Sequence, residues 1–329
     1  MEITQPTRFE WLHELNKRID LGKFTNLRDE YLNLEKGVRG EKDFEKFLFE
    51  NGNPHWVVLK NVWLDCKGKF ECDFLVFTKA RGYLFEIKNY SGKYEYRENQ
   101  WFRYGSPNSH NPLSQVQKAT INVQNIFKNL RNSPKIQGVL VFIGEFNQVH
   151  LYENTHNIQV VQRNELMDLF WEMKQEERNY MGYSPDKKEL LKELARYETV
   201  NPYQNQPVSE EVLQLIRRGI CCSRCSNFDL EKKDGFYICS CGIYEPKDHA
   251  ILRTICEYGI LHPNQNFKTS ELLTFFDGEV SQRSLIRILN KYFQRVGGGR
   301  STEYMNKLIR PENIKSMFQL KGDLFLKLP

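Results

Sequence analysis

The chain has 329 residues, which is more than one ordinary hydrophobic core supports and therefore predicts two or three domains. A hydrophobic content of 40% and a charged content of 27% are typical of a folded globular protein and exclude wholesale disorder. The net charge of +5 is too small to identify a nucleic-acid-binding protein by itself, so any basic surface must be local.

The composition also predicts where the protein resides. No run of about 18 apolar residues occurs, so we expect no membrane span. The first 20 residues mix acidic and basic side chains and lack the apolar stretch of a secretory signal. We therefore expect a cytoplasmic protein, in a compartment where disulfides are rare, and the eight cysteines require another explanation.

The first elements in chain order alternate between helix and strand. Apolar residues recur at helical spacing over residues 8–50, and a stretch rich in β-forming residues follows at 55–65. The segment "FECDFLVFTKARGYLFEIKNY" contains two apolar runs around "KARG", and this pattern predicts a β-hairpin. A second pair of short strands is predicted around "ENQ" in "GKYEYRENQWFRYG".

The next segments complete an α/β pattern. We predict a helix in "NPLSQVQKATINVQNIFKNL", with Pro112 in its first turn, and a buried strand in "KIQGVLVFIGEF". One more strand and a helix follow in "IQVVQRNELMDLFWEM". Residues 37–170 thus predict the α/β class, with a mixed and partly antiparallel sheet flanked by helices. The charged residues 172–208 contain three prolines and predict a helix plus a linker.

Charged residues interrupt the two apolar runs of the hairpin. Glu86 and Lys88 point to one side of their strand because side chains alternate between faces, and Asp73 can reach that side from the neighbouring strand. Such a pair alone is often a solvated ion pair worth less than about 1 kcal/mol. The apolar flanks of Glu86 favour a functional interpretation, because unused charges in a covered strand are costly.

Two carboxylates and one ammonium suit phosphodiester hydrolysis. Carboxylate oxygens can hold Mg²⁺ (or Mn²⁺), which usually takes one or two protein carboxylates and keeps several waters. The cation acidifies a bound water and neutralises charge on the phosphate. A lysine beside it can orient the water or stabilise the pentavalent transition state.

Four blocks in this order resemble the nuclease-related domain called NERD, of the PD-(D/E)xK, restriction-endonuclease-like superfamily: "GEKDFEKFL", "ECDFLVF", "FEIKNYSG" and "NPLSQVQKA". The resemblance implies that Asp73 and Glu86 bind the metal and that Lys88 is catalytic. It also implies that Glu41 adds a carboxylate through water and that Gln115 holds Lys88 or a substrate phosphate. The alternatives are an exposed helix carboxylate at Glu41, near Glu45 and Glu50, and a surface glutamine at Gln115, with Gln117 as a rival.

Five of the eight cysteines fall within 21 residues, which points to a metal. Four thiolates on two tight turns predict a closed, structural zinc site in a zinc-ribbon-like module. The second turn is C-x-C rather than C-x-x-C, so Cys221 or His249 remains a possible substitute ligand. The predicted zinc ligands are Cys222, Cys225, Cys239 and Cys241.

The C-terminal part contains three predicted helices and a Gly-rich turn between two short extended segments. Basic residues recur every four positions in "SQRSLIRILNKYFQR", and apolar residues occupy the opposite side. This order resembles a winged helix-turn-helix, in which the basic helix enters the major groove and the wing contacts phosphate. The alternative is an amphipathic helix whose solvated side happens to be basic. The predicted DNA-binding residues are Arg283, Arg287, Lys291, Arg295 and Arg300.

Together these features predict a metal-dependent DNA nuclease that carries structural Zn²⁺, acts on DNA and forms a possible homodimer. The rivals are a non-catalytic DNA-binding or regulatory protein that uses a nuclease-like fold as a clamp, and a nuclease for RNA or branched DNA. The intact trio of Asp73, Glu86 and Lys88 argues against the clamp. The expected parts are an N-terminal helical extension (1–36), the nuclease domain (37–171), a charged helical linker (172–210), the zinc-ribbon-like module (211–246) and the winged-helix-like domain (247–329).

Overall fold

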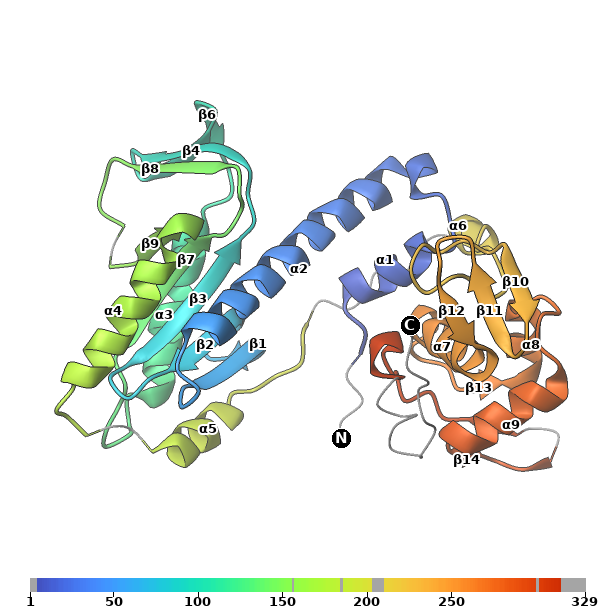
Figure 1. The fold of residues 1–329 in the computed structure, drawn as a ribbon. Helices are drawn as coiled ribbons and strands as arrows, with labels where there is room; N and C mark the ends of the chain where they lie inside the picture. Colours follow the sequence, from blue (N-terminus) through green and yellow to red (C-terminus); the bar gives the residue numbers. More distant parts are fainter. Residues whose placement is uncertain (1–4, 156, 184–185, 203–209, 300–301, 315–329) are drawn as a thin grey trace. The chain divides into compact units, whose positions relative to one another are not determined.

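The computed structural model describes residues 5–155, 157–183, 186–202, 210–299 and 302–314 (Figure 1). The chain divides into two compact units. We call residues 33–203 the sheet unit, and residues 1–32 together with 204–329 the cysteine unit. Among the described residues, no helix has both the length and the apolar character that crossing a membrane requires.

A five-stranded mixed sheet forms the centre of the sheet unit, and this confirms the predicted α/β class. The first three strands pair antiparallel, as the hairpin signal around "KARG" predicts, and the last two join parallel to the third. In spatial order the strands are β1 (Val57–Asp65), β2 (Lys69–Phe77), β3 (Gly82–Lys88), β7 (Ile136–Phe142) and β9 (Gln159–Gln162).

Helices cover both faces of this sheet (Figure 1). On one face lies α3 (Pro112–Phe127), which begins where the Asn111 side chain accepts a hydrogen bond from the Ser114 amide. Its apolar stripe packs into one core cluster with Leu75 and Leu84. On the other face, α2 (Thr25–Asn51) and α4 (Leu166–Asn179) pack their apolar residues against the second cluster. The 3-10 turn η2 (Arg163–Glu165) leads into α4.

A second, smaller sheet follows directly on β3 in the chain and lies beyond the carboxyl end of that strand (Figure 1). The predicted strand pair around "ENQ" corresponds to two of its strands, joined by a turn in which Glu98 and Asn99 both have positive φ. The other two strands are short and were not predicted. In spatial order the strands are β6 (Ser106–Asn108), β5 (Gln100–Arg103), β4 (Gly92–Arg97) and β8 (Asn147–Leu151).

Part of the segment predicted as a linker belongs to the sheet unit. Helix α5 (Lys187–Ala195) buries Leu190 and Leu194 in the same core cluster as α3. The chain beyond it pairs with β1, where the Asp65 amide donates to the Tyr197 carbonyl. Residues 187–199 are therefore part of the fold rather than a free connection.

The prediction of a continuous helix over residues 8–50 is wrong. Helix α1 (Arg8–Asn16) begins with a capping box between Thr7 and Glu10 and ends before Lys17. The chain then forms the 3-10 turn η1 (Leu21–Lys23), in which the Asp20 side chain accepts from the Gly22 amide. Helix α2 starts at Thr25, so the predicted boundary between residues 36 and 37 falls inside one helix.

The cysteine unit contains two further small sheets. A three-stranded antiparallel sheet carries the cysteines, and a hairpin at Asp234-Gly235 joins its first two strands as predicted. A second sheet of two-residue strands accompanies the C-terminal helices in the order β13-β15-β14. The elements are α6 (Glu210–Gln214), β10 (Leu230–Lys233), β11 (Phe236–Cys239), β12 (Tyr244–Pro246), α7 (Lys247–Leu261), β13 (Phe267–Lys268), α8 (Thr269–Phe275), α9 (Gln282–Tyr292), β14 (Arg295–Val296), β15 (Glu303–Tyr304) and η4 (Pro311–Asn313).

Buried charges join the N-terminal segment to α7 inside the cysteine unit. The Arg18 guanidinium lies 2.7 Å from the carboxylate of Glu257, which is fully buried. Arg253 pairs with the same carboxylate at 2.5 Å and with Glu245 at 2.8 Å. Because removing one partner would leave another charge buried and uncompensated, these contacts make residues 1–32 an integral part of this unit.

Candidate active site and zinc centre

Three predicted residues meet at the carboxyl end of β3. Glu86 is buried, and its Oε1 accepts hydrogen bonds from Lys88 Nζ and from Gln115 Nε2, both at 2.7 Å. Lys88 Nζ also lies 3.5 Å from Gln115 Oε1. Strand alternation places Glu86 and Lys88 on the face that α3 covers, and Gln115 sits in the first turns of that helix. Gln115 is therefore not an isolated surface glutamine, because its side chain contacts both Glu86 and Lys88.

Asp73 lies where the pairing between β2 and β3 ends. The ladder runs from Phe77–Gly82 to Phe74–Phe85, and Asp73 is the next residue outward. Its Oδ2 accepts a hydrogen bond of 2.7 Å from the Ile87 amide, so a side chain takes the place of a backbone carbonyl. This bond fixes the Asp73 carboxylate beside the strand that carries Glu86 and Lys88.

Glu41 reaches the site because α2 approaches the sheet closely at Gly40. A Cβ atom on Gly40 would lie 2.6 Å from Asn89 Cβ, so only glycine permits this approach. The Asn89 side chain in turn donates to the Lys36 carbonyl of α2 at 2.8 Å. Of the nearby helix carboxylates, Glu45 is instead paired with Lys60 at 2.7 Å.

Asn61 marks an irregularity in β1 opposite Asp73. It has a φ of 52° within a strand, and its side chain hydrogen-bonds to Glu41. The alternation of β2 changes phase at the same level: Phe74 packs on the side of α2 and α4, whereas Cys72 packs in the cluster of α3. Residues two positions apart on a regular strand lie on the same face, so Cys72 and Phe74 should pack in the same cluster. Because they do not, the paired strands β1 and β2 change face at this point.

Glu71 is a fourth carboxylate at the site that the sequence interpretation missed. Burial, followed by the charges of Glu41 and Glu86, raises the pKa of Glu71 to about 7, while a hydrogen bond from the Trp63 side chain acts in the opposite direction. Its approach to the site accompanies the change of face at Asn61, which no periodic pattern in the sequence signals.

The electrostatics of the site favour a bound cation. Burial and the neighbouring Glu86 raise the pKa of Asp73 well above its ordinary value, and burial likewise raises the pKa of Glu41. Burial alone would lower the pKa of the Lys88 ammonium, but the Glu86 carboxylate outweighs it and raises that pKa. The four carboxylates thus outnumber the two ammonium groups that act on them, Lys88 and, at Glu41, Lys60. Hard oxygen donors of this kind suit Mg²⁺ or Mn²⁺. Among the described residues, the four cysteines of the other unit are the one group of three or more side chains whose ligand atoms are spaced to hold a metal ion.

The comparison with protein families agrees with this geometry. Residues 36–143 match the family model NERD, the nuclease-related domain. This segment therefore resembles a NERD domain. The match covers Glu41, Asp73, Glu86, Lys88 and Gln115 and ends directly after β7. No curated protein and no solved structure matches the chain.

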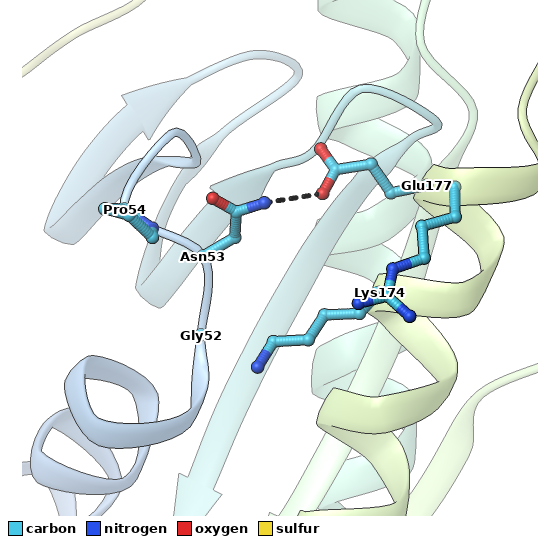
Figure 2. Close-up of a pocket in the computed structure, with 6 residues that line it drawn as sticks. Gly52, Asn53, Pro54, Lys174 and Glu177 are labelled. Carbon is cyan, nitrogen blue, oxygen red and sulfur yellow. Dashed lines mark hydrogen bonds between the residues drawn. The ribbon is translucent and has the colours of Figure 1, made fainter.

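A pocket on the sheet unit lies between the end of α2 and helix α4 (Figure 2). Gly52, Asn53 and Pro54 line it from the end of α2, and Lys174, Glu177 and Arg178 line it from α4. Asn53 donates to Glu177 at 3.1 Å, and the Glu177 carboxylate also accepts from the Lys79 amide, before the start of β3. The pocket is thus at the opposite end of β3 from Lys88.

The four predicted zinc ligands come together in the cysteine unit. The Sγ atoms of Cys222 and Cys241 are 3.5 Å apart, as are those of Cys225 and Cys239, and all four lie within 4.8 Å of one another. A tetrahedron with Zn–S bonds of about 2.3 Å has edges of roughly 3.8 Å, so the four sulfurs fit a zinc ion. The short C-x-C turn is therefore compatible with the site.

The alternative ligands lie elsewhere. Cys221 is fully buried, and its carbonyl accepts from Arg253 Nη2 at 2.6 Å. His249 Nδ1 lies 2.6 Å from Glu245 Oε1. Neither residue belongs to the cluster of four sulfurs, so neither replaces a predicted ligand.

The basic residues predicted on α9 are exposed, as an interaction surface requires. Arg283, Arg287 and Lys291 lie on the solvent side of α9, while Leu285 and Ile288 are fully buried. The prediction that Arg295 continues the same helix is wrong, because α9 ends at Tyr292 and the exposed Arg295 lies on β14. These basic residues also make contacts within the unit: Arg287 forms a paired contact with Asp248 at 2.8 and 2.5 Å, Lys291 Nζ lies 5.1 Å from the centroid of the Tyr292 ring, and Arg295 donates to Thr302 at 2.9 Å. Arg300 lies outside the described residues.

Proposed function

We propose that the protein is a metal-dependent nuclease that hydrolyses phosphodiester bonds of DNA. The observation that carries this proposal is the cluster at the carboxyl end of β3, where Lys88 and Gln115 both donate to the buried Glu86 at 2.7 Å. Asp73 is fixed beside it by the Ile87 amide. The match of residues 36–143 to the nuclease-related domain supports the same class of reaction.

Asp73 and Glu86 are the residues that would hold Mg²⁺ or Mn²⁺, with Glu41 contributing through water. When bound there, the cation supplies an acidified water and neutralises charge on the phosphate. The remaining groups act through position and charge. Gln115 orients the Glu86 carboxylate by donating to Oε1, and that same oxygen holds the Lys88 ammonium in place.

Lys88 acts in this proposal as a permanent positive charge rather than as a base. Because its carboxylate partner raises the pKa of the ammonium above the ordinary value, Lys88 stays protonated at neutral pH. A fixed ammonium at this position can orient the attacking water through hydrogen bonds and stabilise the negative charge that develops on the phosphate.

The experiment compares full-length wild type with Lys88→Ala on plasmid, linear and single-stranded DNA in Mg²⁺ or Mn²⁺. The proposal predicts cleavage by the wild type and a loss of about a hundredfold or more in the variant. Lys118→Ala, an exposed lysine on α3, is the matched control and should cleave like the wild type. Equal inactivity of wild type and Lys88→Ala on every nucleic acid would overturn the enzyme and favour the non-catalytic clamp.

We further propose that the cysteine unit positions the DNA. Its elements follow the order helix, strand, helix, helix, strand, turn, strand from α7 to β15, which is the order of a winged helix-turn-helix. In that arrangement α9 is the recognition helix. Its exposed cations, Arg283 and Lys291, would contact phosphates.

Replacing Arg283 and Lys291 by glutamate tests this role of α9. We expect weaker DNA binding and a smaller slope of log affinity against log salt, by about one for each lost phosphate contact. The matched control replaces Lys232 and Lys233, which are exposed on β10 of the same unit, by glutamate. If the DNA affinity and the salt slope of the α9 variant are unaltered, then α9 is an ordinary amphipathic helix that does not bind DNA.

A further inference from the structure

Two large aromatic side chains are exposed just beyond the catalytic end of β3. The exposed fraction of Tyr104 is 70% and that of Phe146 is 80%. Both neighbour Gly92, which begins the small sheet four residues after Lys88. The Gly92 amide donates to the Phe146 carbonyl at 2.7 Å, and the Tyr104 amide donates to the Lys93 carbonyl at 3.0 Å. Gly92 thus lies between the two residues.

The absence of a side chain on Gly92 makes room for one of these rings. A Cβ atom there would lie 2.6–2.8 Å from three atoms of the Tyr104 phenol, so the ring lies directly over the glycine backbone. Gly92 also has a φ of 113°, which L side chains rarely adopt. Gly92 therefore places no side chain in the space that the Tyr104 ring occupies.

Two cations flank the same stretch of chain. Arg103 Nη2 donates to the Ser91 carbonyl at 3.3 Å, and Lys36 Nζ donates to Ser91 Oγ at 3.0 Å. Both side chains belong to exposed residues. They bring positive charge to the carboxyl side of β3, next to the carboxylates that would bind the metal.

This surface is continuous with the candidate active site. Lys36 is on α2 about one turn before Glu41, and its carbonyl accepts from Asn89, the residue after Lys88. Burial and the nearby charge of Lys88 lower the pKa of His110, which places this exposed residue within the field of the same ammonium. Lys36 therefore links Ser91, beside Gly92, to Asn89, the residue that follows Lys88.

The combination of flat exposed rings and cations fits the chemistry of an unpaired nucleic-acid strand. Bases of a single strand offer both π faces for stacking, and the phosphates between them pair with lysine and arginine. A duplex hides its base faces within the helix, so exposed rings gain little from it.

We propose that Tyr104 and Phe146, flanked by Lys36 and Arg103, form a stacking platform for an unpaired DNA strand that leads into the site of Glu86 and Lys88. This inference rests on the proposed nuclease function and specifies its substrate: a single-stranded segment or a frayed end rather than intact duplex.

The test measures binding rather than cleavage, using full-length protein without added Mg²⁺. Fluorescence anisotropy gives the affinity for a labelled deoxythymidine 20-mer and for a labelled 20-base-pair duplex. The variants are Tyr104→Ala, Phe146→Ala and the conservative Tyr104→Phe. Matched controls are Tyr183→Ala and Phe49→Ala, whose side chains are 86% and 76% exposed elsewhere on the sheet unit.

We expect Tyr104→Ala and Phe146→Ala each to weaken single-strand binding about tenfold, and to change duplex binding less than twofold. Tyr104→Phe keeps a ring and should bind the single strand like the wild type, as should both controls. Single-strand affinities within twofold of the wild type for both alanine variants would overturn the platform. Equal losses for single strand and duplex would also overturn it.

The two proposals fail in distinguishable ways. A wild type that binds the single strand through both rings but cleaves no nucleic acid would contradict the nuclease and support the platform. A wild type that cleaves DNA, with Tyr104→Ala and Phe146→Ala binding and cleaving single strands normally, would contradict only the platform.

Discussion

Glu86 connects the polar groups of the candidate site, because Lys88 and Gln115 donate to the same carboxylate oxygen. Alone, a glutamate two residues from a lysine on a strand is a weak signal. What distinguishes this pair is its surroundings: the side chain of Glu86 is 3% exposed and that of Lys88 is 16% exposed. Asp73, Glu41 and Glu71 add further carboxylates, and such an excess of buried negative charge is costly unless a cation compensates it.

Gln115→Ala should reduce the turnover number for DNA cleavage about 10- to 100-fold, the usual cost of removing a residue that orients a metal-site ligand. The reason is that Glu86 loses one of its two donors and Lys88 loses a contact at 3.5 Å. The melting temperature should stay unchanged because Gln115 is exposed. Gln117→Ala, two positions along α3, is the control. If the two variants cleave equally well, the assignment of Gln115 is wrong.

Glu14→Gln should flatten the dependence of stability on pH. Burial and the neighbouring Glu257 raise the pKa of Glu14 to about 7, whereas an unfolded chain has the ordinary value near 4.5. The folded state therefore binds more protons between these values, so the free energy of unfolding falls as pH rises from about 4.5 to 7. Because glutamine does not ionise, the Glu14→Gln variant does not lose free energy of unfolding in this way as the pH rises.

Thermal melts at pH 5 and pH 8 measure the effect. The melting temperature of Glu14→Gln relative to wild type should rise between the two pH values, while the exposed control Glu231→Gln should follow the wild type. A constant difference between Glu14→Gln and wild type would show that Glu14 does not titrate in this range.

Individual residues differ in how far the sequence could predict them. Asp73, Glu86 and Lys88 lie on regular strands, so alternation alone places them together, and the contacts of Gln115 agree with the family resemblance. Glu71 was missed because its approach to the site accompanies the change of face at Asn61, a left-handed residue inside a strand. A prediction from side-chain alternation holds only for regular strands, so it cannot include the change of face at Asn61.

At the scale of elements, apolar periodicity predicted the strands of the main sheet and most of the helices. Ser281 illustrates a local rule that holds, since its Oγ accepts from the Ser284 amide at the start of α9. The break between α1 and α2 was not predicted because apolar periodicity identifies helices better than it identifies their ends. The interruption depends on distant partners, such as the contact of Arg18 with Glu257. Strands β6 and β8 have too few buried residues to give a pattern.

Two glycines on α2 give a matched test of how this helix positions Glu41. Gly40→Ala would place Cβ 2.6 Å from Asn89 Cβ and 3.0 Å from Ile143 Cγ2, so we expect it to destabilise the sheet unit by about 1–3 kcal/mol and to lower cleavage. Gly37 has no atom within 4 Å of the same position. Gly37→Ala should stabilise the unit by about 0.5–1 kcal/mol and leave cleavage unchanged.

Chemical denaturation and an activity assay on both variants decide the outcome. If Gly40→Ala gains stability like Gly37→Ala and cleaves like the wild type, then α2 does not depend on close approach at Gly40 to place Glu41.

At the scale of the whole molecule, the chain forms two units, and one of them is built from two segments that are not adjacent in the sequence. Residues 1–32 belong with 204–329, although some 170 residues of the sheet unit lie between them in the chain. The contacts responsible, such as Trp11 Nε1 donating to the Leu261 carbonyl at 3.1 Å, join residues 250 positions apart. No local pattern encodes such pairs, so the predicted N-terminal extension could not be assigned to a unit from the sequence.

Zinc should contribute to the stability of the cysteine unit. The four sulfurs lie on two short turns beside a small sheet, so a zinc ion bound to them would link these segments and its binding free energy would contribute to folding. Cys222→Ser should reduce the zinc content, measured by elemental analysis, from one per chain to well below one. It should also lower the melting temperature. Cys66→Ser, outside the cluster, should retain both. Stoichiometric zinc in Cys222→Ser would contradict the ligand set.

The most direct test of the central claim is the initial rate of DNA cleavage in Mg²⁺ by wild type and by Asp73→Asn. Asparagine preserves the size of the side chain but removes the negative charge that would hold the cation. The exposed Asp168→Asn on α4 serves as the matched control. The account predicts Mg²⁺-dependent cleavage by wild type and control, and a rate at least about a hundredfold lower in Asp73→Asn with unchanged melting behaviour. Cleavage by Asp73→Asn at the wild-type rate would contradict it.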